Sequence, residues 1–202
     1  MKILNLYAGV GGNRTFWSDE HEITAVEINK DVAAEYKYKF PHDNVVIADA
    51  HQYLLYHYQE YDFVWSSPPC PSHSKLCYSQ KEKKYADMTL YQQIILLQNW
   101  FKGGFAIENV VPYYDYLISP SVIIGRHPYW TNFRVEKIEV NSIDVSRSTK
   151  EELSEYLGIP IPRINAALLL RNCVEPKVGE HILNSFLKKK IENSYKTGRL
   201  FD

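Results

Sequence analysis

The chain has 202 residues and a mass of 23.6 kDa, enough for one domain with a buried core. Its apolar runs are too short to cross a bilayer, and its first residues lack a signal-peptide cleavage site, so membrane and secreted proteins are disfavoured. The net charge of −1 gives no overall indication of a nucleic-acid partner. Three cysteines, Cys70, Cys77 and Cys173, suit neither a disulfide framework nor a zinc site, so we expect a cytoplasmic protein without a metal.

Short apolar runs alternate with helical patterns through the first half of the chain. Strands are predicted at 2–6, 23–27, 45–48, 61–65 and 105–107, and helices at 30–40 and 89–101. Two more strands are expected within 121–140, a capped helix at 150–158 and a closing helix at 180–191. This alternation predicts an α/β fold with a doubly wound, mostly parallel sheet, in one domain that covers residues 1–202.

Residues that could bind a ligand or take part in catalysis come directly at the ends of five of the predicted strands. They are Gly9-Val10-Gly11-Gly12, Glu27, Asp49, Pro69-Cys70 and Glu108-Asn109. Ligands of open α/β sheets bind where the carboxyl ends of the strands meet. The sequence therefore predicts a single site at this edge of the sheet.

The first three groups fit a cofactor that contains adenosine. Glycines allow a sharp turn into the N-terminus of a following helix, Glu27 could accept from a ribose diol, and Asp49 could accept from the adenine amine. Each group also has a purely structural interpretation. The glycines could form a plain turn, Glu27 could be an exposed strand-end acid, and Asp49 could cap a helix.

The last two groups fit covalent catalysis. Prolines hold Cys70 on a stiff polar loop, which favours a nucleophile over a core cysteine. Glu108 could donate a proton to a ring, or simply pair with a lysine. Ser67-Pro68-Pro69-Cys70 also resembles the signature of amino-group methyltransferases, but cysteine cannot stack on a base as the aromatic residue of that signature does.

Taken in order, these segments resemble the DNA cytosine carbon-5 methyltransferases. The matching segments are NLYAGVGG at 5–12, Val26-Glu27, Ala48-Asp49-Ala50, Pro69-Cys70, Glu108-Asn109-Val110 and RNCVEPK at 171–177. The resemblance implies a Rossmann-like fold of the class I S-adenosylmethionine-dependent methyltransferases. It also implies methyl transfer from S-adenosylmethionine, with S-adenosylhomocysteine as product, to carbon 5 of cytosine.

The resemblance also implies the roles of individual residues. Cys70 would add to carbon 6 of the cytosine, Glu108 would act at ring nitrogen 3, and Asn109 would order the loop. Arg126 would be the arginine of the family's R-x-R motif, with Arg134 as the competing candidate. The implied cofactor contacts are Tyr7, Ala8, Gly9, Gly11, Gly12, Glu27, Ile28, Asp49, Ala50, Pro69, Asn172 and Val174.

The implied partner is DNA with a cytosine flipped out of the stack. Four lysines of the loop after the nucleophile would contact phosphates: Lys75, Lys81, Lys83 and Lys84. A bacterial or phage-encoded enzyme, of the restriction–modification type, is expected.

The chain departs from the family mainly in size. The target-recognition region is absent or vestigial, at about 135–170, so we expect relaxed or short sequence specificity or a separate recognition subunit. Two alternatives stay open: methylation of cytosine in RNA such as tRNA, and a non-catalytic regulatory relative that binds cofactor or nucleic acid.

Overall fold

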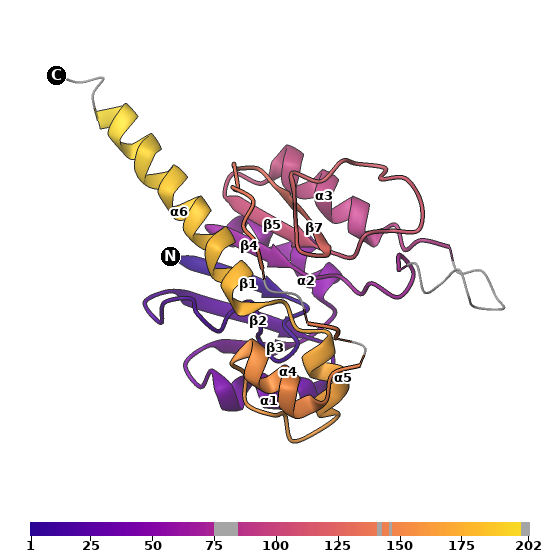
Figure 1. Ribbon diagram of the computed structural model, residues 1–202. Coiled ribbons are helices and arrows are strands. Elements are labelled where there is room, and N and C mark those ends of the chain that lie inside the picture. Colours follow the sequence, from indigo (N-terminus) through magenta and orange to yellow (C-terminus); the bar gives the residue numbers. More distant parts are fainter. Residues whose placement is uncertain (75–84, 141–142, 146, 199–202) are drawn as a thin grey trace.

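The computed structural model describes residues 1–74, 85–140, 143–145 and 147–198, and within them seven strands form one sheet (Figure 1). The strands are β1 Lys2–Leu6, β2 Glu22–Glu27, β3 Asn44–Ile47, β4 Phe63–Ser66, β5 Gly104–Glu108, β6 Val122–Ile124 and β7 His127–Thr131. Their order is β3-β2-β1-β4-β5-β7-β6. Neighbours among β1 to β5 run parallel, whereas β7 runs antiparallel to β5 and to β6. The predicted doubly wound, mostly parallel sheet is confirmed.

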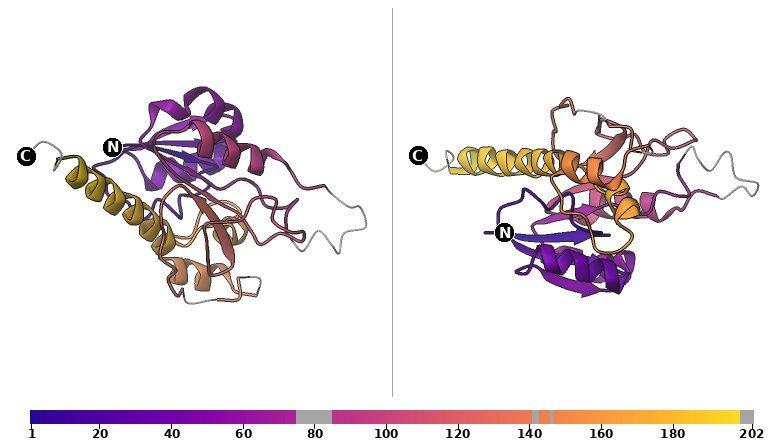
Figure 2. Two further views of the ribbon diagram at one scale, coloured as in Figure 1. Left: turned by 90° about the horizontal axis from the view of Figure 1, so that it is seen from above. Right: turned by 60° about the horizontal axis from the view of Figure 1, so that its bottom comes forward.

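Helices cover both faces of this sheet. They are α1 Lys30–Lys39, α2 Ala50–His57, α3 Thr89–Trp100, α4 Lys150–Leu157, α5 Ala166–Arg171 and α6 Pro176–Gly198, with a short 3₁₀ helix η1 at Tyr58–Glu60. On one face, Ile182 and Phe186 of α6 pack with Trp65 and Tyr129 of the sheet. On the other face, Leu54 of α2 and the helix α3 pack against the alternate strand residues. Figure 2 shows α6 running along its face and continuing beyond the sheet.

Several predicted boundaries need correction. The strand pattern within 121–140 ends at Thr131, and residues 132–140 form no strand. Asn132 explains the break, because its amide accepts from Phe105 N at 3.2 Å and donates to Gly103 O at 2.8 Å. The closing helix starts at Pro176 and not at residue 180. The predicted capping box is present, with Thr149 and Glu152 bonded reciprocally ahead of α4.

The helices α4 and α5 form a small layer of their own beside the sheet. Leu153, Leu157, Ile159 and Leu170 make a separate apolar cluster, which includes no residue of the strands. Among the described residues, none of the helices combines the length and the apolar character of a membrane span. The same residues contain no cluster of histidine, cysteine and carboxylate side chains that could hold a metal ion.

Candidate active site

The chain turns sharply after β1 by taking left-handed backbone angles. The φ angles are 54° at Tyr7, 55° at Gly9 and 75° at Gly11. Gly11 N donates to Ala8 O at 2.9 Å and closes the turn. A side-chain Cβ built on Gly9 would meet nothing within 4 Å, so the loop faces open space at that point. The loop therefore leaves room for a ligand at Gly9, which is half-buried.

The helix expected after this loop does not form, and that prediction was wrong. The chain instead makes irregular turns around Arg14, which is 3% exposed. Its guanidinium bonds to Asp43 at 3.0 Å, to Trp17 O at 2.7 Å and to Asp19 at 2.7 Å. Only nine residues separate Gly12 from β2. The buried ion pair of Arg14 and Asp43 anchors this short connection, where a helix was expected.

Two carboxylates stand at the ends of the next strands. Glu27, the last residue of β2, accepts from Gly9 N at 3.1 Å and from Asn29 N at 2.9 Å, one bond on each oxygen. Each oxygen keeps a second lone pair, so a ribose diol could still bind there. Asp49, after β3, accepts from Gln52 N at 2.8 Å and caps α2. Asp49 thus has the structural role of a helix cap that the sequence had suggested.

The C-terminal segment returns to the glycine loop. A Cβ on Gly12 would come within 2.4 Å of Val174 O, and one on Gly179 within 2.4 Å of Asn13 O. Such close backbone contact requires glycine at both positions. Residues 172–179 therefore lie directly against the loop that follows β1.

The cysteine loop follows β4 and is fixed on two sides. Cys70 is half-buried, and its carbonyl accepts from His73 N and Ser74 N, both at 3.0 Å. The His73 ring is buried and bonds through Nδ1 to the Tyr114 hydroxyl at 2.6 Å. Ser74 pairs with Pro112 in an antiparallel bridge. The loop is thus held against the chain that follows β5.

Glu108 ends β5 and is only 9% exposed. Burial raises the pKa of its carboxyl to about 7, against the opposing effects of a hydrogen bond from Ser67 and the charge of Arg126. Among the described residues, His127 rather than a lysine forms the ion-pair contact with Glu108, with Nε2 lying 3.6 Å from Oε1. Burial lowers the pKa of His127 to about 4. An acid with a pKa near 7 is suited to donate a proton at neutral pH.

One hydrogen bond joins the cysteine loop to the end of β5. Asn109 is buried, and its Nδ2 donates to Pro68 O at 3.0 Å, two residues before Cys70. Its Oδ1 accepts from Val110 N at 2.9 Å, which fixes the orientation of the amide. The cysteine loop is therefore hydrogen-bonded to the residue that follows Glu108, at one edge of the sheet.

Comparison with known protein families gives one decisive match. Residues 1–112, more than half of the chain, match the model of the C-5 cytosine-specific DNA methylases. The chain belongs to this family. The matched segment contains the glycine loop, the cysteine loop and the Glu108-Asn109 strand end described above. The family implies S-adenosylmethionine as the methyl donor.

Solved structures of methyltransferases are similar to this chain at low identity. A DNMT2 mutant from Spodoptera frugiperda has 22% identity and a TM-score of 0.44, and the match covers 70% of this chain and 54% of that one. EhMeth of Entamoeba histolytica has 16% identity and a TM-score of 0.41, covering 76% and 64%. The putative methyltransferase yhhF of Escherichia coli has 16% identity and a TM-score of 0.38, covering 64% and 74%. The methylase thus spans about half the length of the insect chain. No curated protein matches its sequence significantly.

The expected fold of class I S-adenosylmethionine-dependent methyltransferases is confirmed by the strand order together with the family. The residues predicted to hold the cofactor follow the carboxyl ends of four adjacent strands or lie in the returning segment. Tyr7, Ala8, Gly9, Gly11 and Gly12 follow β1, Glu27 ends β2 and Ile28 follows it, Asp49 and Ala50 follow β3, Pro69 lies after β4, and Asn172 and Val174 precede α6. Ile28 is 67% exposed beside Glu27, as a platform for a flat ring would be. The open cradle at Gly9 and the acceptor atoms of Glu27 fit an adenosine moiety.

The predicted nucleic-acid contacts are less completely described. Arg126 lies in the turn between β6 and β7, exposed and next to His127 in the chain. Arg134 is 86% exposed and pairs with Glu136 at 2.9 Å. Of these two arginines, Arg126 is the one whose charge lowers the pKa of Glu108 against the effect of burial. Lys75, Lys81, Lys83 and Lys84 lie outside the described residues.

Sequence reasoning missed a polar network behind the site. Gln93 of α3 is buried, accepts from Ser66 Oγ at 2.6 Å and donates to the Tyr7 hydroxyl at 2.8 Å. It therefore joins the ends of β1 and β4 through one amide. The signal available in the sequence was a single amide on the apolar side of a predicted helix, next to Ile94.

Proposed function

We propose that this methylase transfers a methyl group from S-adenosylmethionine to carbon 5 of cytosine in DNA, through a covalent adduct of Cys70. The observation that carries the proposal is the 3.0 Å bond from Asn109 Nδ2 to Pro68 O. That bond joins the loop that carries the half-buried Cys70 to the residue that follows the buried acid Glu108, and both groups are needed on one pyrimidine ring. An amino-group methyltransferase would need neither.

The chemistry follows from the two side chains. The Cys70 thiolate adds to carbon 6 of the flipped cytosine and forms the C–S bond, while Glu108 donates its proton to ring nitrogen 3. The electron pair of the former 5,6 double bond then makes carbon 5 nucleophilic. S-adenosylmethionine supplies an electrophilic methyl group on a sulfonium. Once carbon 5 has taken the methyl group, a solvent base removes the proton from carbon 5, which restores the 5,6 double bond and expels the Cys70 thiolate. Ring nitrogen 3 returns its proton to the Glu108 carboxylate.

Recognition of DNA is the less specific half of the proposal. The lysines of 75–84 would neutralise phosphates, and Arg126 would contact the target base. The segment 135–170 is short for a recognition domain, which supports a single-domain enzyme with short sequence specificity or with recognition from a separate subunit. The exposed Lys188, Lys189 and Lys190 of α6 add positive charge away from the carboxyl edge.

A trapping experiment tests the proposal. An oligonucleotide with 5-fluorocytosine blocks the last elimination, so the active enzyme remains covalently bound and migrates more slowly on a denaturing gel. We expect the shifted band in wild type with S-adenosylmethionine and its absence in Cys70→Ala. No adduct on single- or double-stranded DNA, from a protein that binds S-adenosylmethionine, would refute DNA methylation. An adduct on RNA alone would favour the RNA alternative.

A further inference from the structure

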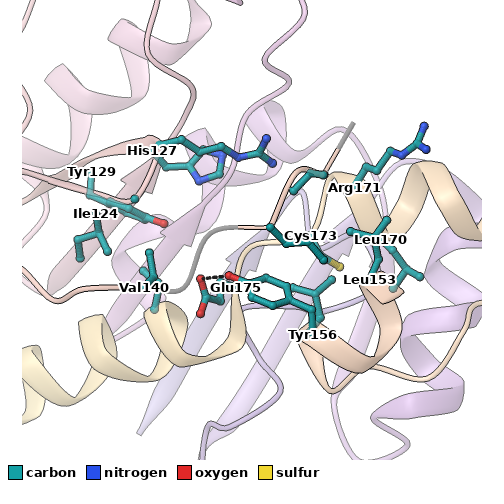
Figure 3. Close-up of a pocket in the computed structure, with 16 residues that line it drawn as sticks. Ile124, His127, Tyr129, Val140, Leu153, Tyr156, Leu170, Arg171, Cys173 and Glu175 are labelled. Carbon is teal, nitrogen blue, oxygen red and sulfur yellow. Dashed lines mark hydrogen bonds between the residues drawn. The ribbon is translucent and has the colours of Figure 1, made fainter. Parts of the chain in front are cut away.

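A pocket of about 350 Å³ lies between the sheet and the helices α4 and α5. His127 and Tyr129 of β7 form one side, and Leu153 and Leu170 form the other (Figure 3). None of the residues that line it belongs to the glycine loop or the cysteine loop. It is therefore distinct from the predicted cofactor contacts at the ends of β1 to β4.

The pocket combines apolar walls with one carboxylate. Branched aliphatic side chains dominate the lining, and Glu175 lies among them, with Oε2 accepting from the Tyr156 hydroxyl at 3.1 Å (Figure 3). Arg126 and Arg171 also line the pocket but are exposed, so their charges lie toward its mouth. A flat ring with N–H donors fits the interior, and an anionic group fits the mouth. A nucleotide of a DNA strand combines these two properties.

The pocket adjoins the acid of the proposed active site. His127 lines it and also stands 3.6 Å, from Nε2 to Oε1, from Glu108. One imidazole ring therefore separates the pocket from the carboxyl that would meet the target cytosine. A strand that delivers a base to Glu108 brings its neighbouring nucleotides close to the pocket.

We propose that this pocket binds a second, non-target base of the same DNA strand, and that Glu175 selects a base with an exocyclic amino group. The inference rests on the proposed function and gives it a specificity-determining residue. Adenine, cytosine and guanine present an amino group that a carboxylate can accept from. Thymine presents carbonyl oxygens on both sides of its single N–H, and these repel a carboxylate. A short preference at one flanking position follows, without a large recognition domain.

The experiment uses the full chain and a pool of duplexes with randomised positions on both sides of one cytosine. Bound duplexes and methylated duplexes are sequenced separately, so the binding readout needs no methyl transfer. We expect wild type to disfavour thymine at one fixed flanking position by about tenfold. Glu175→Gln offers an amide in place of the carboxylate and should lose most of this bias. Glu155→Gln, an exposed acid of α4 outside the pocket, should retain it.

A second variant tests the pocket itself. Val145→Trp adds bulk at a half-buried position of the lining and should weaken binding whatever the flanking base, with circular dichroism to check folding. The inference is overturned if no flanking position shows a base preference, if the preference survives Glu175→Gln, or if the pool is not bound. Selective binding without methylation or adduct would instead uphold the pocket and refute the proposed function.

Discussion

His127 Nε2 lies 3.6 Å from Glu108 Oε1, where β5 and β7 pair in antiparallel register. Burial moves the two groups in opposite directions, raising the pKa of Glu108 to about 7 and lowering that of His127 to about 4. Between about pH 4 and about pH 7 the pair consists of a neutral carboxylic acid beside a neutral imidazole. Such an acid keeps a proton that it can give to a base, as tuned catalytic carboxyl groups do.

The first prediction concerns the pH dependence of methyl transfer. Because Glu108 must be protonated to act at ring nitrogen 3, the single-turnover rate should fall as the pH rises through about 7, the pKa of the carboxyl. Glu108→Gln removes the titrating group, so this descending limb should vanish and the rate should drop by about 10²- to 10⁴-fold. Rates measured from pH 5.5 to about 9 provide the check. A descending limb unchanged in Glu108→Gln would assign it to another group.

The second prediction concerns the ion pair that anchors the turn after β1. Arg14 and Asp43 are each 3% exposed, so removing the Asp43 charge leaves the buried guanidinium paired with the exposed carboxylate of Asp19, which solvent screens. Asp43→Asn should lower the free energy of unfolding by about 3 kcal/mol or more, as measured by urea denaturation.

Asp19 provides the matched control for that prediction. Its carboxylate bonds to the same guanidinium at 2.7 Å but is 82% exposed. Asp19→Asn should therefore cost only about 0.5 kcal/mol. Equal losses in the two variants would show that burial does not determine the strength of this network.

The position of the site could be predicted from the sequence, because parallel strands bring their carboxyl ends to one edge. Glu27 ends β2, and Gly9, which is 18 residues away in the chain, follows β1. This placement was enough to expect the two residues side by side, and Gly9 N indeed donates to Glu27 at 3.1 Å. The helix α2 was missed although Asp49 had been considered as a cap, because its eight residues carry no long apolar period. The helix α5 was missed as well, and its six residues are even fewer than those of α2.

Contacts between distant segments could not be predicted in the same way. His127 reaches Glu108 only because β7 pairs with β5 in one particular register, which strand propensity does not specify. Gln93 bonds to Ser66, 27 positions away in the chain, and to Tyr7, 86 positions away. Nothing local in the sequence marks those partners. The irregular connection after the glycine loop likewise depends on the ion pair of Arg14 and Asp43, which are 29 residues apart in the chain.

The third prediction tests the link between the cysteine loop and β5. Asn109→Asp keeps the shape of the side chain and the acceptor for Val110 N, but it loses the donor to Pro68 O. The buried carbonyl would then face a carboxylate, which should cost about 1–3 kcal/mol of stability and slow adduct formation with 5-fluorocytosine. Asn99→Asp removes a comparable amide-to-carbonyl bond, 2.8 Å to Ile95 O, at an exposed position. That control should form the adduct at the wild-type rate, and a slow control would deny Asn109 a specific role.

The fourth prediction concerns the contact between the glycine loop and the C-terminal segment. Gly12→Ala places a methyl group within 2.4 Å of Val174 O, a backbone atom that cannot rotate away, so the two segments must separate. We expect a loss of about 1–3 kcal/mol in stability and a large loss of S-adenosylmethionine affinity in calorimetry, because both segments contribute predicted cofactor contacts. Gly9→Ala is the comparison, since its Cβ meets nothing within 4 Å and its cost comes from a φ of 55°, about 1 kcal/mol. If Gly12→Ala binds the cofactor as tightly as wild type, the returning segment contributes nothing to that site.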